Sequence, residues 1–152
     1  MRTDRSAFTL VELVITCLIC AILAAAAGPR YLNAYNRYRV DAAAQRIKTD
    51  LDFARQRAIT RSTTQTVQFA PASETYTLLG IADIDRAGQV YMVDLGGVPY
   101  EVNLSAATFG GSPNLVFDHY GLPVSGGTVT VLSGTYSRTV TVNADTGKAS
   151  IP

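Results

Sequence analysis

Cysteine is scarce in this 152-residue sequence. Both cysteines, Cys17 and Cys20, lie in an apolar N-terminal run, and none follows them. A disulfide framework would need cysteines in the rest of the chain, so disulfides do not hold the domain together. On a helix the pair would share one face, as in a redox or metal site, but small apolar packing residues are the simpler interpretation. A lipoprotein cysteine is disfavoured because Thr16 and Ile19, which precede the two cysteines, are not small.

An excess of either charge is also missing. The chain has 13 Lys and Arg against 12 Asp and Glu, a net charge of +1. This balance excludes a bulk attraction to nucleic acid or anionic lipid, so any such attraction would need a local patch. With 47% hydrophobic residues, the chain is too apolar for a disordered tail and is long enough for one modest domain.

Catalytic motifs are lacking as well. The sequence has no Gly-x-Ser-x-Gly elbow, no metal-spaced His or Cys set and no Gly-rich phosphate loop opening a helix. The only constellation that would suit a membrane-anchored enzyme is His119 beside Asp118, with scattered serines. Catalysis requires a nucleophile, a base and an orienting group together, and a lone histidine in a turn is typically a hydrogen-bonded turn residue. The sequence therefore predicts no catalytic residue, no metal and no cofactor.

A single long apolar run is present, from Phe8 to Gly28, and Glu12 is its only charge. As a helix it would span roughly 30 Å, enough to cross a bilayer core. A secretory signal peptide is the alternative, since Arg2 and Arg5 form a basic start and the alanines at 24–27 offer a cleavage site. Glu12 argues against it, because a carboxylate weakens insertion and serves nothing in a discarded segment.

The sequence around this carboxylate, SAFTLVEL from Ser6 to Leu13, resembles the prepilin cleavage motif of type IV pilins and type II secretion pseudopilins. The resemblance implies that a prepilin peptidase cuts between Ala7 and Phe8 on the cytoplasmic side and N-methylates Phe8. The family usually has glycine at the position of Ala7, so processing is expected to be slower but not abolished. The resemblance also pairs Glu12 with the new amine of a neighbouring subunit during assembly. The alternative is a carboxylate that reaches the headgroups without a partner.

The charges that flank the run leave the orientation open. Arg2 and Arg5 are offset by Asp4. Basic residues follow the run too: Arg30, Arg37 and Arg39. The positive-inside rule thus does not favour a cytoplasmic N-terminus, but the peptidase requires one. We expect a single-pass protein of the bacterial inner membrane, with its globular domain outside the cytoplasm and a place in a filament after assembly.

Beyond Gly28-Pro29, which permits a kink or a short break, helical periodicity returns from Val40 to Ile59. Apolar residues recur there at spacings of three or four: Val40, Ala43, Ile47, Leu51, Ala54 and Ala58. This pattern predicts an amphipathic helix that rests one stripe on a domain. Arginines from Arg30 to Arg61 suggest nucleic acid, but aspartates interleave with them: Asp41, Asp50 and Asp52. A solvated face or salt bridges between subunits fit that pattern better.

After Arg61 the period changes to two. Strands are predicted at Thr66–Phe69, Thr75–Leu79, Val90–Leu95, Tyr100–Leu104, Leu115–Phe117, Thr128–Leu132 and Thr139–Val142. Turns are predicted at Gly-Gly pairs beginning at 96, 110 and 126 and at residues 145–147. The fold class is α+β, with a long N-terminal transmembrane and amphipathic helix packed on a C-terminal antiparallel sheet, as in pilins. The expected divisions are a leader (1–7), a transmembrane and assembly helix (8–28), an amphipathic stalk helix (29–62) and a β-rich globular domain (63–152).

A second resemblance rests on the segment LVFDHYGLP at 115–123, the Gly-Gly pair at 126 with the strand after it, and short stalk patterns near Asp50 and Arg55. These residues resemble the GspH/FimT family of minor pseudopilins and minor pilins. Some FimT-like members bind DNA through a basic run near the C-terminus, where this chain has only Arg138 and Lys148, so any DNA contact is predicted to be weak.

The resemblances together predict a minor pilin or pseudopilin subunit. Its expected partners are other subunits, the prepilin peptidase and the inner membrane. DNA is the alternative partner, in a FimT-like uptake role. The residues fit a type II secretion pseudopilus and a type IV pilus equally.

Overall fold

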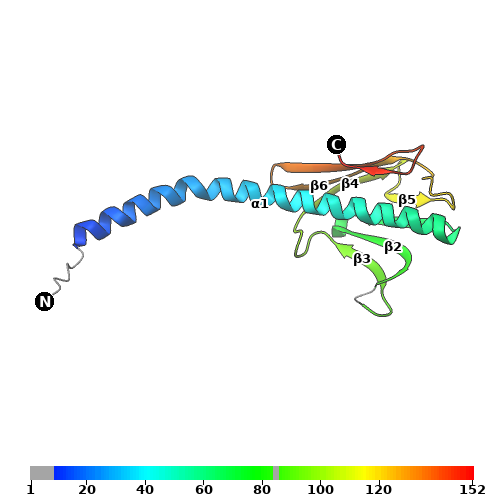
Figure 1. The fold of residues 1–152 in the computed structure, drawn as a ribbon, viewed down its shortest axis with the longest axis horizontal. Coiled ribbons are helices and arrows are strands. Elements are labelled where there is room, and N and C mark those ends of the chain that lie inside the picture. Colours follow the sequence, from blue (N-terminus) through cyan, green and yellow to red (C-terminus); the bar gives the residue numbers. More distant parts are fainter. Residues whose placement is uncertain (1–8, 84–85) are drawn as a thin grey trace, which may run out of the picture. The chain divides into compact units, whose positions relative to one another are not determined.

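A computed structural model describes residues 9–83 and 86–152 of the chain (Figure 1). Its first element is one long helix, α1 (Leu10–Arg61). The chain divides into two compact units, Met1–Tyr35 and Asn36–Pro152, so the first contains the N-terminal part of α1 and the second contains the rest with all the strands. The break that Gly28-Pro29 permits is not used, because α1 continues through both residues.

The end of α1 is closed by a Schellman motif. Ser62 adopts a left-handed backbone conformation, with φ of 49°. Its N–H donates to the carbonyl of Ile59, and the N–H of Thr63 donates to the carbonyl of Ala58, both at 3.2 Å. These two bonds satisfy carbonyls that a helix end leaves unpaired, and they turn the chain directly into the first strand.

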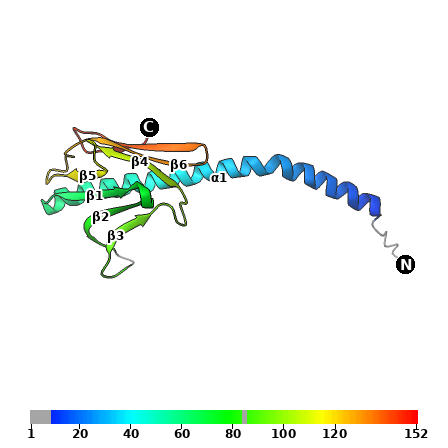
Figure 2. The same cartoon turned by 180° about the vertical axis from the view of Figure 1, so that it is seen from behind.

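The second unit contains two four-stranded antiparallel sheets. The strands are β1 (Gln65–Ala70), β2 (Thr75–Ala82), β3 (Val90–Asp94), β4 (Asn103–Phe109), β5 (Asn114–Phe117), β6 (Gly127–Ser133), β7 (Tyr136–Val142) and β8 (Ala149–Ser150), and a short 3-10 helix, η1 (Pro71–Ser73), joins β1 to β2. One sheet has the order β3-β2-β1-β5 and the other β4-β6-β7-β8. Figure 2 shows the first sheet along the C-terminal part of α1, with β6 and β4 of the second sheet beside the same part. The predicted α+β class is confirmed, with two sheets where the sequence indicated one.

The predicted strands match the observed ones except near residue 100. Tyr100 and Glu101 were expected to begin a strand, but both donate their N–H groups to the carbonyl of Gly97 and form a turn. Glu101 has φ of 47°, which a strand does not allow. The strand starts at Asn103 and continues to Phe109 through Ser-Ala-Ala, where the alternation of polar and apolar residues is lost. The two-residue β8 is too short to give a periodic signal.

The predicted stripe on α1 is the helical side of the core. All six of its residues are at most 1% exposed: Val40, Ala43, Ile47, Leu51, Ala54 and Ala58. The inward positions of the strands supply the other side, including Phe69 on β1, Leu78 on β2 and Val131 on β6. Three alanines in the stripe let the sheets approach the helix closely, because a methyl group adds little bulk.

Candidate assembly helix and polar sites

The predicted processing site, Ala7 and Phe8, lies outside the residues that the structure describes. The described part of α1 begins with an N-terminal cap. The Thr9 hydroxyl accepts a hydrogen bond from the backbone N–H of Glu12 at 3.2 Å, and the Thr9 carbonyl accepts one from Leu13 at 3.2 Å. Thr9 and Glu12 therefore stand at the two positions of a capping box, Thr-x-x-Glu. Glu12 also lies in the first turn, where the helix macrodipole favours a negative charge.

The surface of α1 in the first unit is apolar and exposed. Between residues 10 and 25, nine large aliphatic side chains are at least 51% exposed: Leu10, Val11, Leu13, Val14, Ile15, Leu18, Ile19, Ile22 and Leu23. Cys17 and Cys20 are free and exposed within the same stretch. The helix is long and apolar enough to cross a membrane by length and composition. In the stretch 10–25 the described chain covers none of these side chains, so their environment must come from outside the protein.

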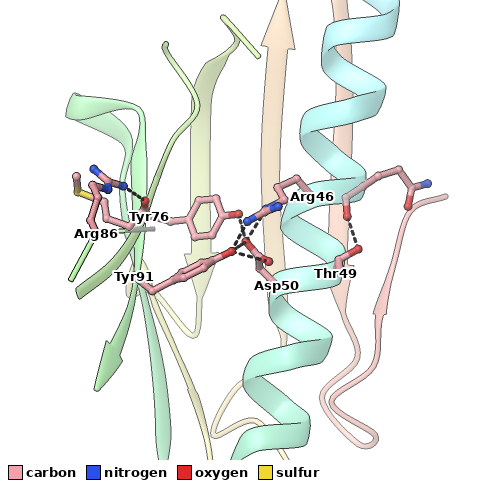
Figure 3. A network of polar contacts seen from close by, with 8 residues as sticks. Arg46, Thr49, Asp50, Tyr76, Arg86 and Tyr91 are labelled. Atoms are coloured by element: carbon pink, nitrogen blue, oxygen red, sulfur yellow. Dashed lines mark hydrogen bonds and ion pairs between the residues drawn. The ribbon is translucent and has the colours of Figure 1, made fainter. Parts of the chain in front are cut away.

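A buried carboxylate links α1 to the first sheet (Figure 3). Asp50 is 5% exposed and accepts a hydrogen bond from the Tyr76 hydroxyl at 2.5 Å. The Tyr91 hydroxyl lies 3.1 and 3.2 Å from the two carboxylate oxygens of Asp50. Arg46 Nε also donates to the Asp50 carboxylate, at 3.1 Å. Arg46 also donates to the Tyr91 hydroxyl and stacks its guanidinium over that ring, 5.9 Å from the centroid. One helix turn and two neighbouring strands are thus joined around a single charge.

The same contacts shift the pKa values of the surrounding groups. Burial raises the pKa of Tyr76 far above its usual value, and the negative charge and hydrogen bond of Asp50 raise it further. Burial and Asp50 likewise raise the pKa of Tyr91. For Arg46, burial acts to lower the pKa, but the attraction of Asp50 and the tyrosines outweighs it and raises the pKa. Both tyrosines remain protonated donors and Arg46 a cation throughout the physiological range.

The sequence grouped Asp50 with charges expected on a solvated face or in salt bridges between subunits, but Asp50 is buried and is bonded within its own chain. Asp50 sits three residues after Ile47 and four before Ala54, so it shares the buried stripe. Its position in the stripe was a readable signal. No sequence signal indicated the two tyrosines that bond to Asp50, because they are 26 and 41 residues away from it in sequence.

Asp118 closes the turn that holds His119. One Asp118 carboxylate oxygen accepts the N–H groups of Tyr120 and Leu122 at 2.9 and 2.8 Å. The exposed His119 ring packs against that of Tyr120, with centroids 3.9 Å apart. This oxygen is therefore bonded to the backbone of the turn, and within the described part of the chain Asp118 makes no hydrogen bond to His119. Across residues 9–83 and 86–152 no group of three or more His, Cys, Asp or Glu could hold a metal ion.

The two predicted DNA-contact residues are not brought together. Arg138 Nε donates to Asp41 at 2.6 Å, and Arg37 lies 3.9 Å from the other oxygen of Asp41. Lys148 is exposed, and its carbonyl accepts the N–H of Asn143 at 3.1 Å. Asn143 follows Arg138 by five residues along β7 and the turn after it, a separation of roughly 16 Å. A neutralised arginine and a distant lysine do not form one phosphate-binding patch.

Comparison with known proteins gives two family matches. A family model described as type II transport protein GspH matches residues 43–146, and one described as a prokaryotic N-terminal methylation motif matches residues 2–28. No curated protein matches the sequence significantly.

Two solved structures share the fold. The type IV minor pilin FimU of Pseudomonas aeruginosa is 16% identical, with a TM-score of 0.54 over 76% of this chain and 90% of that one. The minor pseudopilin EpsH from the type 2 secretion system of Vibrio cholerae is 15% identical, with a TM-score of 0.57 over 75% of this chain and 96% of that one. At these identities the likeness establishes the fold and no more.

Proposed function

The chain belongs to the GspH family of type II transport proteins and carries its N-terminal methylation motif, and on this basis we propose that it is a minor pseudopilin or minor pilin. In this proposal a prepilin peptidase cuts between Ala7 and Phe8 and methylates the Phe8 amine. The mature subunit stays in the inner membrane with its second unit outside the cytoplasm. It then assembles through α1 into a type II secretion pseudopilus or a type IV pilus.

The observation that carries the proposal is the uncovered apolar surface of α1. Burying one large aliphatic side chain is worth about 1.5–3 kcal/mol, so the nine exposed ones represent at most about 14–27 kcal/mol. Water is therefore a poor environment for this segment. A bilayer before assembly and the helices of other subunits after it would both cover the segment, which is the sequence of environments that a filament subunit passes through.

Glu12 has two roles in this proposal, and they are separable. In the Thr-x-x-Glu capping box its side chain would accept the Thr9 N–H and stabilise the start of α1, a role that a glutamine would also fill. As an ion it would pair with the Phe8 amine of a neighbouring subunit, which a glutamine would not do. A carboxylate and an amine both inside an apolar bundle stabilise each other only when they are close, so the pair would set the axial register between subunits.

The proposal assigns no catalytic role to the chain. The matching family model is described as a type II transport protein, and that description names no catalytic activity. The one histidine lies in an exposed turn whose carboxylate is already bonded to backbone N–H groups. The experiment that tests the proposal is N-terminal sequencing and mass measurement of membrane-extracted protein. A mature chain that begins with N-methylated Phe8 supports it, and Ala7→Gly should speed that processing.

The matched control is Ala7→Leu, which adds bulk at the proposed cleavage subsite and should leave the precursor uncut. A mature chain beginning near Gly28 would identify a secretory signal peptide and refute the anchor. Retention of an uncut chain in the presence of an active peptidase would refute the processing step.

A further inference from the structure

The C-terminal end of α1 has two arginines, Arg57 and Arg61, that the rest of the described chain does not neutralise. Arg37, Arg39 and Arg46 on the earlier turns pair with Asp41, Glu101 and Asp50. Neither Arg57 nor Arg61 forms an ion pair with a carboxylate of residues 9–83 or 86–152. The two are four residues apart, so they project from the same face of the helix.

A concave site lies beside these arginines. A pocket of about 390 Å³ is lined by Arg57, Arg61, Thr63, Thr64, Gln65, Leu79 and Gly80. The Schellman motif at Ser62 places both threonines there, because it reverses the chain against the last helical turn. No carboxylate belongs to this lining.

Strand β2 builds the opposite wall. The register between β2 and β3 shifts between Leu78 and Ala82, and Gly80 within that bulge has φ of 74°. The bulge turns the Gly80 carbonyl toward α1, where it accepts a hydrogen bond from Arg57 at 3.3 Å. Arg57 is thereby held across the pocket while Arg61 stays exposed. Leu79 is 42% exposed and gives the pocket an apolar rim.

We propose that this pocket is a docking site for carboxylate side chains of a neighbouring protein subunit. Two arginines and two threonines line the pocket, and this lining matches carboxylates because arginine binds them in a bidentate geometry. The apolar rim and the enrichment in arginine are typical of protein interfaces. A nucleic acid fits less well, because its phosphate backbone needs an extended row of basic residues. This site has only two arginines, and the whole protein has a net charge of +1.

Carboxylate binding at this pocket does not depend on the proposed function. Only the identification of the neighbour as a filament subunit rests on that function. The site lies in the second unit, about 38 Å along α1 from Asn36, where that unit begins. Binding at the pocket is measurable whether or not residues 1–7 are removed. Failure of processing and failure of this site are therefore distinguishable.

The test uses the full chain in detergent micelles and a hexaglutamate peptide, with binding followed by NMR through the backbone amides of Thr63 and Thr64. We expect saturable shifts of these amides. Substituting both Arg57→Gln and Arg61→Gln should weaken binding about tenfold. The matched control, Arg37→Gln with Lys48→Gln, removes two charges from the same helix and should change the affinity by less than about twofold. Arg61→Gln alone, at an exposed residue, should weaken binding about threefold with unchanged thermal stability.

Four results would overturn the proposal. The peptide could leave both threonine amides unshifted, or the pocket and control variants could bind it equally. Inorganic phosphate could bind at the same amides as tightly as the peptide, which would make this a simple anion site. A short DNA duplex could bind there more tightly than the peptide, with the loss again confined to the Arg57 and Arg61 variants, which would make it a nucleic-acid site.

Discussion

The buried carboxylate of Asp50 gives the sharpest prediction about stability. In Asp50→Ala, the Tyr76 hydroxyl keeps its buried position and loses its acceptor. Leaving such a group unsatisfied costs about 1–3 kcal/mol, and the charged hydrogen bond that is lost adds to this. Arg46 is 42% exposed and Tyr91 is half-buried, so water replaces most of the hydrogen bonding to Asp50 that they lose. We expect a loss of about 3 kcal/mol in the free energy of unfolding.

This loss corresponds to a fall in Tm of roughly 10–15 °C for a domain of this size. Near-UV circular dichroism of the full chain in micelles would follow it, because six of the eight tyrosines lie in the second unit and no tryptophan interferes. The matched control is Asp52→Ala. Asp52 is 43% exposed and lies 3.9 Å from Lys48 on the same helix, so its loss should change Tm by less than about 2 °C.

Tyr76→Phe completes a double-mutant cycle. In the parent it removes one hydrogen bond and should cost about 1–1.5 kcal/mol. In the Asp50→Ala background the same change removes an unsatisfied hydroxyl and should be neutral or stabilising. Equal effects of Tyr76→Phe in both backgrounds, or equal Tm values for Asp50→Ala and Asp52→Ala, would refute the reasoning.

The remaining predictions concern pH, assembly and DNA. The folded-state pKa of Tyr76 is raised above its ordinary 10.0, so its contribution is complete below pH 10 and is lost as pH rises further. Phenolate absorbance should show one tyrosine ionising only with unfolding, and Tyr76→Phe should remove that late step. Glu12→Gln should keep the capping box and membrane insertion, but it should lower co-purification with filament partners as much as Glu12→Ala does. If Glu12→Gln co-purifies as the parent does, the role of Glu12 is limited to capping. Duplex DNA should bind weakly, and the affinity should fall steeply with added salt. The double substitution Arg138→Ala with Lys148→Ala should change this affinity little. Tight binding at physiological salt that the double substitution abolishes would favour a DNA-uptake role.

The helix–sheet architecture was readable from the sequence because its signals are local. The stripe from Val40 to Ala58 repeats every three or four residues, and all of its members are buried. Most strands alternate with period two and appear where predicted. The prediction was wrong at Tyr100–Leu104, where a turn with a left-handed Glu101 replaces the expected strand start. A single residue's backbone conformation decides such a boundary, and periodicity does not encode it.

The family and the apolar N-terminal helix also follow from sequence, since an apolar run with one early carboxylate is a property of composition and order. The cleavage at Ala7 and the pairing of Glu12 with a neighbouring subunit stay predictions. The residues before Thr9 lie outside the described structure, and the pairing needs a second subunit.

Only the tertiary structure decided which charged side chains are paired within the protein and which are left to bind a partner. Asp50 is satisfied by two tyrosines from β2 and β3, and Arg138 is neutralised by Asp41, which is 97 residues away. Arg57 and Arg61 look no different in sequence from the arginines before them, but the β2 bulge and the turn at Ser62 build a pocket around them that contains no carboxylate. The sequence determines which face of each element is apolar. Which polar groups meet depends on the register and packing of distant segments, and this sets the role of each charge.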